Sequence, residues 1–268
     1  MDGEAPVVPG AYLSLNSANV NEAEMFHFAD GELIQRQLTG TWHPFSTRMV
    51  NHREIAFRLD LDGEAHEVFV RLKNRGGVAV TPVLSGGVDW FLRVSRTQLL
   101  LGATLGMLVI MMLYNLVVFG IVRERVFGLF AMALLFAVMY RTTVFGFGAQ
   151  YLWPDYPHLN DPILRVGAGF SMATLLLFSR EYLRTRTWAP RLDLALLSLA
   201  IIVALTLSFP VFRGNPGLAM LVLAMVPLLA TLSSALAVFE ACRAPALFCL
   251  PGWSIVHRWW CCSCGCRD

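Results

Sequence analysis

The chain has 268 residues and a formal net charge of +2; 56% of its residues are hydrophobic and only 15% are charged. Soluble globular domains average about 45–50% apolar and about 25% charged residues, so this composition excludes an ordinary soluble protein. No basic stripe with interleaved aromatic residues is present, which argues against a nucleic-acid partner.

The charged residues gather in the N-terminal third, where 12 of the 19 acidic residues precede Arg96. Short β-prone stretches, such as 55–59 and 68–72, alternate here with turn sequences rich in Gly, Asp and Asn. We therefore expect residues 1–92 to form an all-β sandwich. It contains no cysteine, so no disulfide framework supports it.

Both ends of this domain carry a specific expectation. Residues 1–6 lack the basic start and the apolar segment of a secretory signal. Either the coding sequence begins further upstream, which we favour, or the first membrane helix exports the domain. At the other end, Trp90 and Phe91 precede the apolar region, and we expect both rings at the lipid headgroups.

Residues 97–256 are predicted to form an all-α transmembrane bundle. The first span has no charge over 24 residues, enough to cross a hydrocarbon core of about 30 Å. A sixth apolar segment, 244–256, has only 13 residues and contains Pro251-Gly252, so it is too short to span comfortably. The five clear spans are 99–122, 126–148, 163–182, 194–212 and 217–239.

The arginines of the connecting loops predict the orientation. Positive residues concentrate in cytoplasmic loops, so the loops between spans one and two, three and four, and after span five are assigned to the inside. The loop 149–162 has no basic residue, and Arg213 is the sole one between spans four and five. The N-terminal domain is therefore extracytoplasmic. The inner arginines are Arg123, Arg125, Arg180, Arg184, Arg186, Arg191 and Arg243.

Four segments in order carry a resemblance to a known family: 93–102 entering the first helix, 111–116 within it, 150–154 in the outer loop and 178–183 ending the third helix. They are similar to bacterial seven-transmembrane receptors with diverse intracellular signalling modules (7TMR-DISM). The N-terminal part resembles their smaller extracellular domain, a carbohydrate-binding-like β-sandwich. The resemblance implies an external sensor that signals through the helices to an output module such as a histidine kinase or diguanylate cyclase.

The C-terminal end departs from that plan, because five clear spans replace seven and no output module follows. All six cysteines lie at or after Cys242, several of them in the tail 257–268. The Cys-x-x-Cys spacing at 261–264 has no partner pair, so we expect no metal site. We hypothesise that a frameshift or truncation has replaced the remaining helices and the output module.

In the N-terminal domain, Trp42, His43 and Phe45 follow a Gly-Thr pair in a predicted loop. Aromatic side chains on the loops of a β-sandwich can stack on sugar rings, which would suit the resemblance. Packing in the core or at a sheet edge is the commoner role of such residues. The three are the candidate ligand-binding residues.

Four residues of the spans are candidates for helix packing or coupling. Gly102 and Gly106 form a Gly-x-x-x-Gly pattern, which favours close packing within the bundle or, alternatively, a homodimer. Asn115 is expected to hydrogen-bond a neighbouring span. Arg141 lies past the middle of its span, so it either reaches the outer surface or couples helices.

These features predict the input module of a membrane receptor in the bacterial inner membrane, with an extracytoplasmic ligand of carbohydrate type. A transporter or channel subunit and a non-functional truncated remnant are the alternatives. Transporters tend to show internal repeats and broken helices, and the sequence shows no repeat. No nucleophile–base pair, phosphate loop or metal motif is present, so neither an enzyme nor a cofactor is expected.

Overall fold

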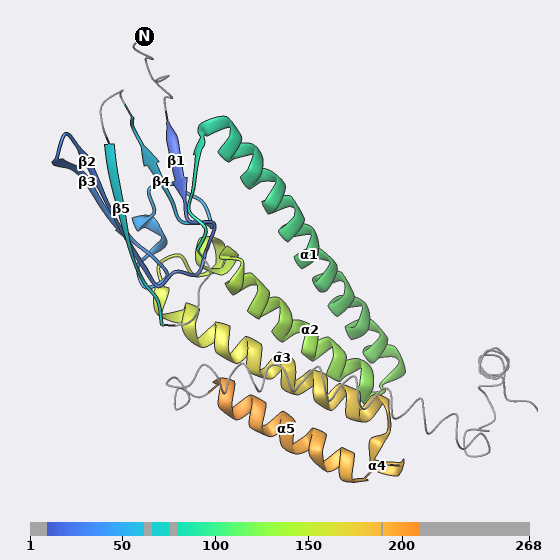
Figure 1. The fold of residues 1–268 in the computed structure, drawn as a ribbon. Helices are drawn as coiled ribbons and strands as arrows, with labels where there is room; N and C mark the ends of the chain where they lie inside the picture. Colours follow the sequence, from blue (N-terminus) through green and yellow to red (C-terminus); the bar gives the residue numbers. More distant parts are fainter. Residues whose placement is uncertain (1–9, 62–65, 76–79, 189, 209–268) are drawn as a thin grey trace, which may run out of the picture.

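The computed structural model describes residues 10–61, 66–75, 80–188 and 190–208. An N-terminal β domain sits at one end of a bundle of long helices, and the first helix runs from the side of that domain along the bundle (Figure 1). The predicted fold class, a β domain followed by a helical membrane region, is confirmed.

Where the structure describes it, the β domain consists of two three-stranded antiparallel sheets. One sheet has the order β4–β1–β6 and the other the order β3–β2–β5. Strands β2 and β3 form a hairpin through Asp30-Gly31, and both turn residues have positive φ. The strands are β1 (Ala11–Ser14), β2 (Glu22–Ala29), β3 (Glu32–Thr39), β4 (Ala56–Leu59), β5 (His66–Lys73) and β6 (Val83–Gly86).

The core of the β domain lies between the inner faces of the two sheets. Met25 of β2 and Phe57 of β4 are completely buried, together with Leu15 and Ile55 from the connecting segments. Along β2, Ala23, Met25 and His27 are buried on the core side, and of the outward positions only Glu24 is also buried, which is the pattern of a strand with one face on a core. The opposite face of the β3–β2–β5 sheet is therefore left to solvent.

In the described residues, four long helices follow, and three of them are long enough and apolar enough to cross a membrane. Helix α1 has 36 residues and is about 54 Å long, well beyond a hydrocarbon core of about 30 Å. Helix α2 packs against both α1 and α3, and α3 packs against α5. The helices are α1 (Gly87–Val122), α2 (Arg125–Val144), α3 (Asn160–Tyr182) and α5 (Pro190–Ser208), with a short α4 (Thr185–Trp188) before the last.

Helix α1 begins at Gly87, inside the segment 1–92 that the sequence assigned to the β domain. Its first turns are still part of the β domain's packing. Trp90 is 8% exposed and stacks on Tyr12 of β1 with ring centroids 4.8 Å apart, whereas Phe91 is 63% exposed. Of the two rings expected at the headgroups, Trp90 thus belongs to a small core with Ala56 and Val94.

The predicted second span, 126–148, runs four residues beyond helix α2. Gly146 has a φ of +82°, which a continuing right-handed helix does not allow, so the chain turns there. The predicted third span, 163–182, begins three residues after the start of α3, and the fourth, 194–212, starts within α5. The spans 217–239 and 244–256 and the tail 257–268 lie outside the described residues.

The turns that carry the predicted inner arginines lie together. Arg123 and Arg125 flank the turn between α1 and α2, and Arg184 and Arg186 lie between α3 and α5. Both turns are at the end of the bundle away from the β domain (Figure 1). This arrangement supports the orientation derived from loop charge.

Truncation of Trp90 tests the role of the first turns of α1. We expect Trp90→Ala to lower the free energy of unfolding of the β domain by about 3 kcal/mol, because the ring fills a buried site. Phe91→Ala, the exposed neighbour, is expected to cost less than about 1 kcal/mol. Thermal unfolding of the full chain in nanodiscs, followed by near-UV circular dichroism, measures both. Equal losses for the two variants would contradict the assignment.

Candidate functional site at the junction of the β domain and the helices

The β domain contacts the helices in two places. The first is the start of α1, where Arg93 Nη2 donates to Ser14 Oγ of β1 at 2.7 Å beside the buried Trp90. The second is the loop that joins α2 to α3, which meets two connecting segments of the β domain, 15–21 and 40–54. This loop contains a single π-helical turn, Gly148–Leu152, and a 3₁₀ turn, Pro157–Leu159.

The β domain caps the end of helix α2. The last carbonyl groups of a helix have no intrahelical donor. Here Asn19 Nδ2 donates to the carbonyl of Val144 at 2.9 Å, and Arg53 Nη1 donates to the carbonyl of Phe145 at 3.4 Å. The guanidinium also interacts favourably with the negative end of the helix dipole. Residues about 125 and 92 positions away in sequence therefore complete α2.

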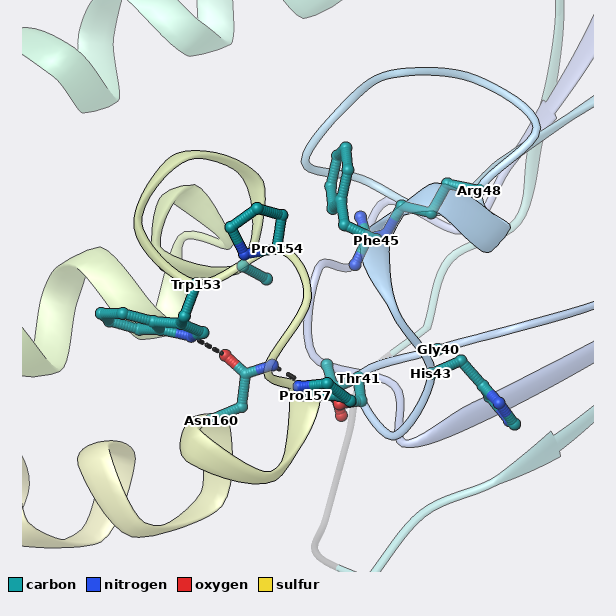
Figure 2. Close-up of a pocket in the computed structure, with 10 residues that line it drawn as sticks. Gly40, Thr41, His43, Phe45, Arg48, Trp153, Pro154, Pro157 and Asn160 are labelled. Atoms are coloured by element: carbon teal, nitrogen blue, oxygen red, sulfur yellow. Dashed lines mark hydrogen bonds between the residues drawn. The ribbon is translucent and has the colours of Figure 1, made fainter.

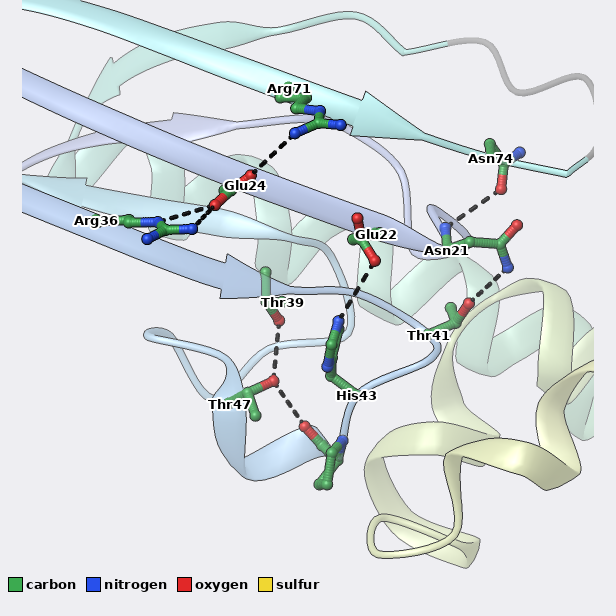
Figure 3. Close-up of polar contacts among 11 residues, drawn as sticks. Asn21, Glu22, Glu24, Arg36, Thr39, Thr41, His43, Thr47, Arg71 and Asn74 are labelled. Atoms are coloured by element: carbon green, nitrogen blue, oxygen red, sulfur yellow. Dashed lines mark hydrogen bonds and ion pairs between the residues drawn. The ribbon is translucent and has the colours of Figure 1, made fainter.

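A buried polar relay connects the β domain to the start of α3 (Figures 2 and 3). Asn21 Nδ2 donates to Thr41 Oγ1 at 3.1 Å, and Asn160 Nδ2 donates to the carbonyl of Thr41 at 3.4 Å. Trp153 Nε1 donates to Asn160 Oδ1 at 2.7 Å. On the other side, the N–H of Arg75, just after β5, donates to Asn21 Oδ1 at 2.8 Å. The relay thus runs from the end of β5 to the first residue of α3.

The relay is accompanied by close backbone contact. The N–H of Phe45 donates to the carbonyl of Pro154 at 2.9 Å. A Cβ atom at Gly146 would lie 2.7 Å from Ala18 Cβ and 3.1 Å from the carbonyl oxygen of Arg53. Real Cβ atoms essentially never come as close as the 2.7 Å contact with Ala18, so Gly146 permits both the turn after α2 and the contact with the β domain.

The segment 48–54 concentrates buried charge at the junction. Arg53 and Glu54 form an ion pair at 2.5 Å, and both side chains are 6% exposed. Arg48 Nη1 donates to the carbonyls of His52 and Arg53, which fixes the turn of this segment. Burial lowers the pKa of Arg48 to about 10, and burial also lowers the pKa of Arg53, partly offset by Glu54. Because the segment contains two arginines, Arg48 and Arg53, and one carboxylate, Glu54, its net charge is positive.

His52 joins this segment to α1. Its ring lies edge-on to Trp90 with centroids 5.6 Å apart, and its Nδ1 accepts the N–H of Glu54 at 3.1 Å. Burial, together with the charges of Arg53 and Arg48, lowers the pKa of His52 to about 4. The ring is therefore neutral near pH 7, with its proton on Nε2.

The crevice between the β domain and the α2–α3 loop is small. Its volume is about 10 Å³, room for one water molecule and not for a sugar. Gly40, Thr41 and Arg48 line it from the β domain, and Trp153 and Asn160 line it from the helices (Figure 2). The crevice is thus a tight interface, and its residues suit mechanical contact better than ligand capture.

The three predicted ligand-binding residues do not form one site, because two of them line the crevice and Trp42 does not. Phe45 and His43 line the crevice, and the Phe45 ring is covered by the Arg48 guanidinium at 4.8 Å. His43 Nε2 lies 4.0 Å from Glu22 Oε2 (Figure 3). Trp42 instead lies beside β5, where it packs under two cations of that strand's end.

The predicted packing residues of the spans have different surroundings. A Cβ atom at Gly102 or Gly106 would meet nothing within 4 Å, so in the described bundle the Gly-x-x-x-Gly face of α1 is open. Asn115 is buried, and its Nδ2 donates at 2.8 Å to the carbonyl of Met111 in its own helix. Arg141 is exposed in the last turn of α2, with its guanidinium 5.9 Å from the Phe145 ring.

The sequence analysis did not identify the residues that build the junction. Asn19, Asn21 and Thr41 are ordinary loop residues and Asn160 begins α3, and each bonds to a partner far away in sequence. The sequence did contain one signal: Gly146 and Gly148 interrupt an apolar run that otherwise reads as one continuous span. Such glycines often mark a close backbone approach.

Comparison with known proteins agrees with this architecture. The family model "7TM diverse intracellular signalling" matches residues 97–263, well over half of the chain. The model "7TMR-DISM extracellular 2" matches residues 7–85, which is the β domain. No curated protein and no solved structure matches the chain.

The lowered pKa of His52 predicts a pH dependence of stability. The unfolded ring has a pKa of about 6.5, so between pH 6.5 and about 4 the unfolded state binds an extra proton. Stability conferred by the neutral ring is complete above pH 6.5 and is lost as the pH falls towards 4, by about 1–2 kcal/mol after allowing for screening. We expect His52→Asn, which keeps an acceptor for the Glu54 N–H, to remove this contribution to the pH dependence of the free energy of unfolding. Identical pH profiles of thermal unfolding for the two proteins would refute the assignment.

Proposed function

The chain belongs to the 7TM diverse intracellular signalling family, whose domains form the sensory modules of membrane receptors, and we propose that its β domain binds an extracytoplasmic ligand and transmits binding to the helices. The N-terminal domain of such a receptor is extracellular. We propose that this chain lies in the bacterial inner membrane, and the arginine-rich turns at the far end of the bundle support an orientation with those turns inside.

The capping of α2 by Asn19 and Arg53 is the observation that carries the proposal. A β domain that was merely tethered would need no contact with the helices beyond the start of α1. Here it supplies hydrogen-bond donors to the end of α2 and, through Thr41, an acceptor to the start of α3. Any shift of these loops therefore changes which polar groups of two membrane helices are satisfied.

A ligand can act through this contact only if the β domain and the helices have two relative arrangements and the ligand binds one of them more tightly than the other. The relay links the position of β5 to the two arrangements. Asn21 is hydrogen-bonded to the residue after β5 and to Thr41, and the carbonyl of Thr41 accepts from Asn160 of α3. Binding that moves β5 relative to β2 thus alters the bonds of Asn160. A coupling free energy of 1–3 kcal/mol is typical of such transmission.

The opposite end of α3 is fixed to α5. Arg180 binds Asp193 through two parallel contacts, Nε to Oδ1 at 2.5 Å and Nη2 to Oδ2 at 2.9 Å. Thr185 in the intervening turn also donates to Asp193 at 2.9 Å. A displacement of α3 is therefore passed to α5 through a bidentate ion pair at the arginine-rich end of the bundle.

The open Gly102/Gly106 face of α1 supports the proposal that two copies associate through this helix. Small residues allow close approach of helices in lipid, where apolar burial gives little driving force.

We also propose Trp42 as a ligand contact, because its ring lies at the edge of the exposed sheet under two cations.

A matched pair of glycine variants tests the coupling. Gly146 and Gly31 both have a φ of +82°, so alanine strains the backbone equally at either position. Only at Gly146 does the new methyl group meet the β domain; at Gly31 nothing lies within 4 Å. We expect Gly146→Ala to raise amide hydrogen exchange several-fold in 41–54 and in the first turn of α3.

The decisive region in this experiment is the inner turn Thr185–Trp188, at the opposite end of α3. A coupled receptor predicts altered exchange there in Gly146→Ala and unchanged exchange in Gly31→Ala, both measured on the full chain in nanodiscs. If exchange changes only beside Gly146, the β domain is not coupled to the inner end and the proposal fails.

A further inference from the structure

The outward face of the β3–β2–β5 sheet carries aromatic and charged side chains in an ordered pattern. On β2, the outward positions alternate with the buried Ala23, Met25 and His27. Strand register places Arg36 and Phe69 beside Phe26, and Arg71 beside Glu24. We call this surface the cation–aromatic face; its central residues are Glu24, Phe26, Phe28, Arg36, Phe69 and Arg71.

One aromatic ring of this face is exposed, and the other two, Phe26 and Phe28, are partly buried. Phe69 is 56% exposed, and its ring meets Phe28 edge to face with centroids 5.9 Å apart. The guanidinium of Arg36 lies 5.5 Å from the centre of the Phe26 ring. Exposed aromatic residues grouped with arginine are typical of binding surfaces.

The charges on this face are held in place by one carboxylate (Figure 3). Glu24 Oε1 accepts from Arg36 Nε at 2.9 Å and from Arg36 Nη2 at 2.6 Å, and Glu24 Oε2 lies 3.8 Å from Arg71 Nη1. The Glu24 side chain is 9% exposed, whereas those of Arg36 and Arg71 are 64% and 73% exposed. Two oriented guanidinium groups therefore share one negative charge, and their remaining N–H donors are available to an anion.

The face continues to the end of β5 with the same alternation of ring and cation. Trp42 lies under Lys73 Nζ at 5.7 Å and under Arg75 at 4.8 Å. Along β5, Phe69 to Lys73 spans about 13 Å at 3.3 Å per residue. This end is also where the polar relay to α3 begins, at the N–H of Arg75.

This chemistry indicates an extended anionic ligand. Arg36 and Arg71 are too exposed to enclose a small molecule, which proteins bury by 70–90% in a concave site. The row of rings and cations instead suits a chain that lies along the sheet, with flat apolar surfaces for the rings and carboxylates for the guanidinium groups.

We propose that the cation–aromatic face binds an acidic polysaccharide, with sugar rings lying on Phe69 and Trp42 and carboxylates held by Arg36 and Arg71. This inference rests on the proposed function, since it names the class and the place of the ligand that the receptor senses. Because the relay starts at the same end of β5, occupation of the face acts directly on the bonds of Asn21.

Isothermal titration of the full chain in zwitterionic nanodiscs tests the proposal. The probes are oligogalacturonate, alginate and hyaluronate fragments, with fully methyl-esterified oligogalacturonate as the neutral match and poly-glutamate as an acidic peptide. We expect at least one acidic saccharide to bind, more weakly as the salt concentration rises. Arg71→Gln should weaken it about tenfold, because a charge-assisted bond is lost.

Arg58→Gln is the matched control, since Arg58 is an exposed arginine on β4 of the other sheet, paired with Asp60. Phe69→Ala is a second variant that leaves the Glu24 cluster intact, and it should also weaken binding several-fold. Equal binding of the methyl ester, equal or tighter binding of poly-glutamate, equal effects of the two arginine variants, or no binding of any acidic saccharide would each overturn the proposal. The glycine experiment above needs no saccharide, so the proposed coupling stands or fails separately.

Discussion

The end of helix α2 imposes the constraint on which the junction depends. The last carbonyl groups of a helix have no intrahelical donor, and a buried backbone group left without a partner costs free energy. The chain turns immediately at Gly146, so these carbonyls have no helical continuation. Asn19 and Arg53 satisfy them from the β domain. The helix is thus complete only when the domain is docked, and this dependence links the state of the domain to that of the helix.

The two contacts between domain and helices differ in physical character. At α1 the contact is largely apolar: Trp90 and Val94 are buried against Tyr12 and Ala56, and α1 continues without a break across the membrane. At the α2–α3 loop it is largely polar, made by directional hydrogen bonds beside the buried Arg53–Glu54 ion pair of the β domain. Apolar burial tolerates small shifts, whereas hydrogen bonds weaken steeply with misalignment. The α2–α3 contact is therefore the one that a ligand can open.

Sequence patterns predicted the features that depend on composition and period. Apolar runs predicted the long helices α1, α2, α3 and α5, the loop arginines predicted an extracellular N-terminal domain, and alternation with turn residues predicted the β domain. They failed where a residue's role depends on a distant partner. From the sequence, Trp90 was predicted to lie at the lipid headgroups, whereas in the structure its ring stacks on Tyr12 of β1. Trp42, His43 and Phe45 were grouped because they are close in sequence, yet the structure distributes them between the crevice and the edge of β5.

The buried charges of segment 48–54 are consistent with a junction that must open. A buried ion pair seldom adds stability relative to apolar residues of the same shape, because desolvation opposes the attraction. Arg53 and Glu54 therefore add little stability to an interface that stays closed. They are suited to a reversible one, because the cost of burying them falls when the loop separates and water returns. The apolar contact at α1 then holds the domain in place while the α2–α3 contact opens, which makes the start of α1 the pivot of the movement.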